Sequence, residues 1–156
     1  MGMLQNKDYG TTTLQRVLAA GIKRCQLGDV RDIDRQPGDN GEMGKGPLSK
    51  TIVNLTLEEA SKTTDGDTVN AGFPTAVSIN VWEGREDEAR AQFRELAIAV
   101  LGKERNTKDD MVAAVDAAGG WPALKGKPLL VEFAVKKGFS EAKAFNRIPN
   151  GAPGAP

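Results

Sequence analysis

The chain has 156 residues and no net charge, because 21 basic side chains balance 21 acidic ones. This length favours a single domain with a substantial core, and the balanced charge argues against a nucleic-acid binder that is positive over its whole surface. Histidine is absent and Cys25 is the only cysteine, which excludes an intramolecular disulfide, a typical zinc site and a Ser-His or Cys-His catalytic pair. We therefore predict a protein that is not an enzyme, with no catalytic residues, no metal and no cofactor.

The two ends of the chain differ in composition from its middle. Residues 1–13 are polar and predict a flexible N-terminal arm, residues 14–149 predict a single domain, and residues 150–156 form a Pro/Gly tail with no means to pack. There is no signal peptide and no apolar run of about 18 residues. We therefore expect a cytoplasmic protein without membrane contact, located in the host cytoplasm if a phage encodes it.

The first element, residues 14–27, has two interpretations. Its apolar residues fit a helical stripe, but Leu18, Ala20 and Ile22 also fit one face of a strand. Gly21 disfavours a helix by about 1 kcal/mol relative to Ala, whereas in a strand it marks a bulge or a bend. We favour the strand. A long loop over residues 28–49 follows, with four glycines and two prolines between residues 36 and 47, and we expect it to be mobile in the free protein.

Two strands come next. Residues 50–59 alternate apolar and polar side chains, and after a turn at residues 64–67 the same alternation runs from Phe73 to Trp82. Trp82 falls on the polar face with Ser78 and Asn80. Either the following helix covers it, or it is a platform on which a planar ligand stacks.

Two helices are predicted after these strands. Residues 85–101 are amphipathic and acidic in the first turn, and Gly102 suits the C-terminal cap. Thr107 is the predicted cap of a second helix with Asp109 and Asp110 in its first turn, which Gly119-Gly120 ends. Capping explains these acidic residues, so we assign them no chemistry.

The segment from Trp121 to Ile148 is basic. It predicts a hairpin, with a strand over 128–137 whose inward residues are Leu129, Val131, Phe133 and Val135, a turn at 136–140 and a returning strand over 142–148. Six basic residues against two acidic ones give it a charge of about +4, beside Phe139 and Phe145. Such a surface suits phosphate contacts and base stacking, although lysines that flank a turn are also commonly just solvated.

The order of these elements predicts an α+β, mainly β domain. Three strands, a helical segment between strands 3 and 4, and a final hairpin are the order of an OB-fold-like five-stranded barrel. In that fold, oligonucleotides cross strands 2 and 3, and the loops between strands 1 and 2 and between strands 4 and 5 close over them. Here those loops are residues 28–49 and 136–141.

Two short stretches carry a family resemblance. They are Asp65-Gly66-Asp67-Thr68-Val69-Asn70-Ala71-Gly72-Phe73-Pro74, before the third strand, and Leu124-Lys125-Gly126-Lys127-Pro128, before the hairpin. With the helical block between them, they resemble the small single-stranded DNA-binding proteins of tailed phages. The likeness covers residues 14–149 by element order. The Pro/Gly tail departs from the acidic tail of the bacterial proteins of that functional class, so no tail-mediated partner is implied.

The resemblance implies non-sequence-specific binding of single-stranded DNA in phage DNA replication or recombination. The affinity would be modest, or would be gained by several subunits of a homo-oligomer on one strand. The side chains that would meet phosphates are Lys23, Arg24, Lys50, Lys127, Lys136, Lys137, Lys143 and Arg147, and those that would stack on bases are Trp82, Phe139 and Phe145. The rival hypothesis is a virion decoration or adaptor protein, in which the long loop and both termini order against neighbouring subunits.

Overall fold

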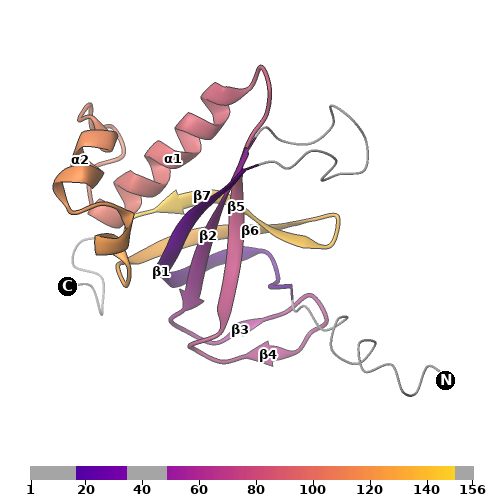
Figure 1. Cartoon of the computed structure of the whole chain (residues 1–156). Coiled ribbons are helices and arrows are strands. Elements are labelled where there is room, and N and C mark those ends of the chain that lie inside the picture. Colours follow the sequence, from indigo (N-terminus) through magenta and orange to yellow (C-terminus); the bar gives the residue numbers. More distant parts are fainter. Residues whose placement is uncertain (1–16, 35–48, 150–156) are drawn as a thin grey trace, which may run out of the picture.

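The computed structural model describes residues 17–34 and 49–149 (Figure 1). The predicted arm 1–13, the tail 150–156 and residues 35–48 of the predicted loop lie outside the described residues. The strands and helices are β1 (Gly21–Asp34), β2 (Ser49–Leu57), β3 (Ser61–Lys62), β4 (Thr68–Val69), β5 (Pro74–Val81), α1 (Glu86–Leu101), α2 (Met111–Ala117), the 3₁₀ helix η3 (Trp121–Leu124), β6 (Pro128–Lys136) and β7 (Phe139–Asn146).

The fold is mainly β, as the sequence predicts. Five strands form one antiparallel sheet in the order β5-β2-β1-β6-β7, and β3 pairs with β4 in a small hairpin at the predicted turn. Strands β5 and β7 are the two edges of the five-stranded sheet, so the predicted barrel is not closed between the described strands. Part of the reason is α1, which packs against β5, β6 and β7. The carboxylate of Glu95 on this helix accepts a hydrogen bond from the backbone N–H of Phe145 on β7, at 2.9 Å.

Strand β1 belongs to both halves of the sheet. Its first half, Gly21–Gln26, pairs with β6, and the part after Cys25 pairs with β2. The strand is irregular between Leu27 and Val30, where the pairing register with β2 shifts. Gly28 lies in this bulge, and a Cβ there would come within 3.1 Å of the backbone oxygen of Asn54. A side chain there would require Asn54 to move by a few tenths of an ångström, so glycine suits this close approach of β2.

The structure settles the first element as a strand and corrects the loop that follows it. Of the predicted segment 14–27, the residues from Gly21 onward belong to β1, and no helix forms among its described residues 17–27. The bend lies at Gly28 rather than at Gly21. Residues 28–34, predicted as loop, continue β1: Gly28 and Asp29 form the bulge, and residues 30–34 pair with Ser49–Val53 of β2. Pairing with a regular neighbour overrides the low strand propensity of Asp32.

The core lies between the sheet and α1. Alternate residues of β2, β5 and β6 are buried, as their periodicity predicts, and they meet the buried face of α1 around Leu96 and Val100. Val135 is an exception, because its side chain is 40% exposed near the end of β6, where the hairpin extends past the core (Figure 1). Within the described part of the chain, no helix is long and apolar enough to cross a membrane.

The helix caps agree with the sequence in one case and differ in the other. Gly102 takes the left-handed conformation at the end of α1, with φ of 70°. Helix α2, however, begins at Met111, and Asp110 rather than Thr107 is its N-terminal cap: one oxygen of the Asp110 carboxylate accepts hydrogen bonds from the N–H groups of Val112 and Ala113. The Thr107 hydroxyl instead accepts a bond from the Asp109 N–H in the preceding turn.

The buried thiol of Cys25 gives a prediction about pH. Burial, followed by the charges of Glu58 and Glu59, raises its pKa from 9.0 to about 12. Above about pH 9 the unfolded thiol ionises while the folded one stays protonated, so this contribution to stability is lost as the pH rises from about 9 to 12. In urea titrations at about pH 8 and about pH 10.5, we expect the wild type to lose more free energy of unfolding than Cys25→Ala. Equal losses in the two proteins would contradict this assignment.

Candidate functional site

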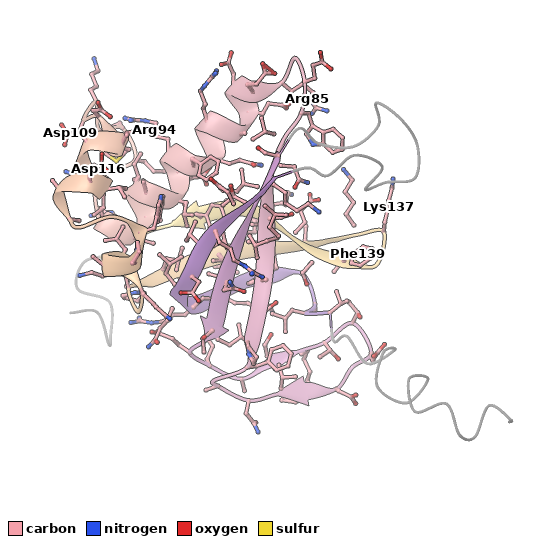
Figure 2. The ribbon with its side chains drawn as sticks, in the orientation of Figure 1. Arg85, Arg94, Asp109, Asp116, Lys137 and Phe139 are labelled. Atoms are coloured by element: carbon pink, nitrogen blue, oxygen red, sulfur yellow. The ribbon has the colours of Figure 1, made fainter. Side chains whose placement is uncertain are left out.

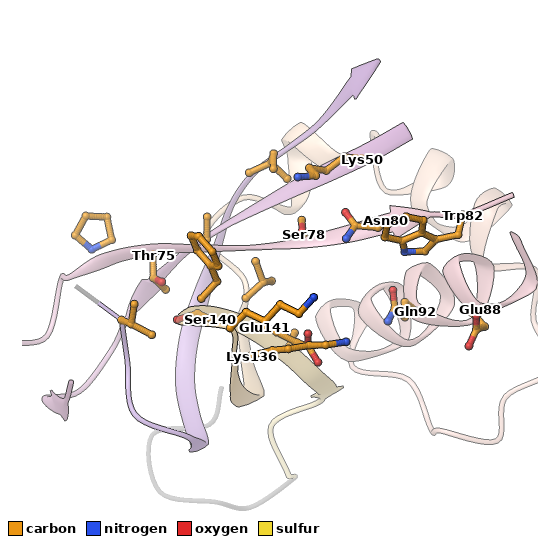
Figure 3. Close-up of a pocket in the computed structure, with 18 of the residues that line it drawn as sticks. Lys50, Thr75, Ser78, Asn80, Trp82, Glu88, Gln92, Lys136, Ser140 and Glu141 are labelled. Atoms are coloured by element: carbon orange, nitrogen blue, oxygen red, sulfur yellow. The ribbon is translucent and has the colours of Figure 1, made fainter. Parts of the chain in front are cut away.

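A groove of about 950 Å³ lies where the two edge strands face each other. Its walls come from β2, β5, the first turns of α1, and the hairpin of β6 and β7 (Figure 3). Three segments that are far apart in the sequence therefore meet in one depression. The side chains that matter for its chemistry are Lys50, Ser78, Asn80, Trp82, Arg85, Glu88, Gln92, Lys136, Lys137, Phe139, Ser140 and Glu141.

The floor of the groove is the outer face of β2 and β5. Lys50 lies directly across from Asn80, and Ile52 across from Ser78, so these four side chains share a face. Trp82 continues the same face at the end of β5 and is 39% exposed. Its backbone oxygen accepts a hydrogen bond from the N–H of Arg85, at 3.0 Å. This turn places the indole at the start of α1, without the helix covering it.

The hairpin forms the opposite wall. Lys137 and Gly138 connect β6 to β7, and both have positive φ, of 53° and 81°. Positive φ at both central residues is typical of a type I′ turn, whose twist matches that of the flanking strands. The turn brings Lys136 opposite Phe139 in the register, and the ring of Phe139 is 62% exposed. Figure 2 shows Lys137 and Phe139 on this hairpin, apart from the helices.

The charge of the groove is positive overall. Four cations, Lys50, Arg85, Lys136 and Lys137, line it with two carboxylates, Glu88 and Glu141. Arg85 and Glu88 form an exposed ion pair with an Nη2 to Oε1 distance of 3.0 Å, and the hydrogen bond to Arg85 lowers the pKa of Glu88 below its usual value. The lysines therefore supply most of the positive field that a ligand meets.

The structure brings together five of the eleven residues predicted to bind nucleic acid. Lys50, Trp82, Lys136, Lys137 and Phe139 all line the groove. The other six do not line it: Lys23, Arg24, Lys127, Lys143, Phe145 and Arg147. Lys23 and Arg24 lie on the half of β1 that pairs with β6, and Arg24 forms an ion pair with Glu58.

The remaining predicted cations have other surroundings. Lys127 is exposed just before β6, and its backbone oxygen accepts a hydrogen bond from Leu27. Lys143 is exposed at the register shift of β7. Arg147 pairs with Glu104 at 3.0 Å and donates to the backbone oxygen of Gly102. Arg147 thus ties the end of β7 to the end of α1.

Phe145 is a core residue rather than a stacking platform. Its side chain is only 3% exposed, which leaves no ring face for a base. In a regular strand every second residue lies on the same face, so Phe145, six residues after Phe139, would share its outer face. The register shift between Glu132 and Phe133 makes Lys143 an extra residue in β7, however, and an extra residue turns those after it to the other side of the sheet.

Several lining residues were not predicted as site residues. Asn80 and Ser78 share the face of Trp82, which the alternation of β5 indicates, but nothing in the sequence shows that this face lines a groove. Gln92 and Arg85 come from α1, whose position against β5 depends on tertiary packing. In the described residues, no group of three or more His, Cys, Asp or Glu side chains is arranged to hold a metal ion.

In comparisons with known proteins, no protein-family model and no curated protein matches this chain. Its function therefore has to be inferred from the chemistry of the groove.

The two phenylalanines of β7 give a stability prediction. Phe145→Ala opens a cavity in the core and should lower the free energy of unfolding by about 3–5 kcal/mol. Phe139→Ala removes a mostly exposed ring and should change it by about 0.5 kcal/mol or less. Equilibrium urea denaturation of both variants measures the difference. If Phe145→Ala is no more costly than Phe139→Ala, the assignment of Phe145 to the core is wrong.

Proposed function

We propose that this chain binds single-stranded DNA without sequence specificity, along the groove between β5 and β7. One observation carries the proposal: the groove combines lysines with two exposed aromatic rings, although these side chains come from β2, the end of β5 and the β6–β7 hairpin. A positive groove that follows the phosphates, with aromatic rings on which bases stack, is how proteins bind single strands of any sequence.

The arrangement of strands supports an open OB-type barrel as the scaffold. In that fold, the second and third strands and the loop between the fourth and fifth strands contact oligonucleotides. The corresponding parts here are β2, β5 and the β6–β7 turn, if β3 and β4 are taken as an insertion between the second and third strands. Those are the parts that line the groove.

The hairpin tip has a conformation that favours a functional role for Lys137. A left-handed backbone costs a residue with a side chain roughly 1–2 kcal/mol, so type I′ turns prefer Asn, Asp or Gly at this position. Lys137 keeps this conformation at φ of 53°, exposed at the tip of the hairpin. A lysine there extends the positive charge of Lys136 along the edge of the groove, where a phosphate of a bound strand would pass.

The expected affinity is modest. Lys50, Lys136 and Lys137 offer about three phosphate contacts, and three contacts to a single strand give a slope of about −2 for log K against log salt. Each ring that stacks on a base contributes perhaps 1–3 kcal/mol. Because the whole chain is neutral, binding depends on the local field of this groove rather than on a general attraction to DNA.

Salt dependence tests the proposal directly. We expect a labelled single-stranded oligonucleotide to bind at about 50 mM salt and to bind roughly 15- to 20-fold more weakly at about 200 mM, as measured by fluorescence anisotropy. Lys136→Glu with Lys137→Glu should weaken binding strongly and reduce the salt slope. The matched control is Lys108→Glu with Lys125→Glu, which makes the same change of charge outside the groove and should have little effect.

Two results would overturn the proposal. One is no binding of the wild type at low salt, and the other is equal losses in the two double variants, which would mean a diffuse charge effect. A shell or ring of subunits in size-exclusion chromatography without DNA, together with no DNA binding, would favour the rival function as a virion component.

The two tryptophans allow a residue-level test. Trp82 lies in the groove, whereas Trp121, at the start of η3, lies outside it and lines a separate depression together with residues of α1 and α2. Stacking of a base on Trp82 should quench its fluorescence, so Trp82→Phe should abolish most of the quenching that DNA causes, and Trp121→Phe should preserve it. Quenching that survives Trp82→Phe and disappears in Trp121→Phe would place the DNA elsewhere.

A further inference from the structure

Uncharged polar side chains gather in one part of the groove. Ser78, Asn80 and Gln92 line the part formed by β5 and α1, with Lys50 across from Asn80, while Lys136 stands on the hairpin (Figure 3). These polar groups matter because phosphates and bases make different demands. A phosphate needs donors and positive charge, whereas the edge of a base needs both donors and acceptors.

Asn80 has an unusual environment within this floor. Its Oδ1 is buried, and it has no hydrogen-bond partner; among the described side chains, Glu86 Oε1 is the other atom in this state. A buried polar atom without a partner costs about 1–3 kcal/mol, and such atoms in folded proteins call for an explanation. Asn80 is also the neighbour of Trp82 on the same face of β5, and both lie at the same end of the groove (Figure 3).

We infer that Asn80 contacts the edge of a base that stacks on Trp82, so that this base turns its edge toward β5. This inference rests on the proposed function. The amide can distinguish the two components of DNA through its oxygen, because a phosphate has no proton to donate to Oδ1, whereas every base carries an N–H group on its edge. Oδ1 is buried in the free protein, so this contact requires the amide to rotate and present its oxygen to the groove.

The side chain can reach such a base without a change of backbone. The last torsion of Asn is broad and roughly two-fold, so a rotation about it exchanges the oxygen and the nitrogen. The amide then presents an acceptor, a donor or both to the groove, as Asn does when it binds adenine through two hydrogen bonds. Any base can make this contact, and the contact discriminates only weakly between bases. This fits binding without sequence specificity.

Paired ligands test the inference. One is an oligonucleotide of about 12 deoxycytidines, and the other has the same sugar-phosphate length without bases. We expect Asn80→Ala to weaken binding of the deoxycytidine ligand about 5- to 20-fold, as for loss of a good base contact, and to leave binding of the abasic ligand unchanged. Lys137→Ala should weaken both ligands by the same factor and reduce the salt slope by about 0.7, whereas Asn80→Ala should leave the slope unchanged.

Asn54→Ala is the matched control. Asn54 lies on the neighbouring strand β2, outside the groove, and donates to the backbone oxygen of Asp29 at 3.2 Å. The Asn54→Ala variant should bind both ligands as the wild type does. Because Asn80 Oδ1 lacks a partner in the free protein, Asn80→Ala should keep or raise the midpoint of urea unfolding, which shows that any loss of binding does not come from misfolding.

The outcomes separate the inference from the function on which it rests. If the wild type binds the deoxycytidine ligand and Asn80→Ala has no effect, or weakens the abasic ligand equally, the inference is wrong and the proposed function survives. If the wild type binds neither ligand at low salt, the proposed function itself fails.

Discussion

The structure depends on the shared pairing of β1. The strand pairs with β6 through Gly21–Gln26 and with β2 through most of the rest of its length, and the bulge at Gly28 lets one strand serve both. Because β7 pairs with β6 and β5 pairs with β2, the bend of β1 makes the two edge strands face each other. The backbone of Leu27 also bonds to Gly126 and Lys127, at 2.7 and 2.9 Å, which ties the start of β6 to the same point. The bend of β1 thus creates the groove, although β1 supplies none of the side chains that line it.

Helix α1 limits the opening between β5 and β7, because it covers one end of that opening. At one end the helix packs against both strands, and Glu95 occupies a donor of β7 that a closed barrel would use to pair with β5. Beyond the helix, the hairpin extends past the core with Val135 and Phe139 exposed. An edge strand presents unpaired backbone groups, so such an edge is normally covered or protected by charge. Here Glu141 and Lys143 protect β7, and a ligand in the groove would cover the rest.

The sequence predicts the regular elements better than the site. Alternation identified β2, β5 and β6 within a few residues, because each buries one face against a single core. It also placed Trp82 correctly on the face of Ser78 and Asn80, since no irregularity interrupts β5. Residues 28–34 were mistaken for loop because their strand exists only through pairing with β2. Phe145 was misassigned because the extra residue Lys143 changes the face on which it lies, and a bulge of this kind leaves no mark on hydrophobic periodicity.

The chain has no net charge, yet its groove is positive. Nine acidic side chains lie between residues 83 and 116, where Asp87 pairs with Arg90, Glu88 with Arg85 and Asp109 with Lys103. These pairs cancel charge locally. Lys136 and Lys137, by contrast, stand at the tip of a hairpin that extends away from the helices (Figure 2). At physiological salt the field of exposed charges falls off within about 8 Å, so distant carboxylates scarcely weaken these lysines. A neutral protein can therefore carry a positive groove, and a ligand would sense the groove rather than the total charge.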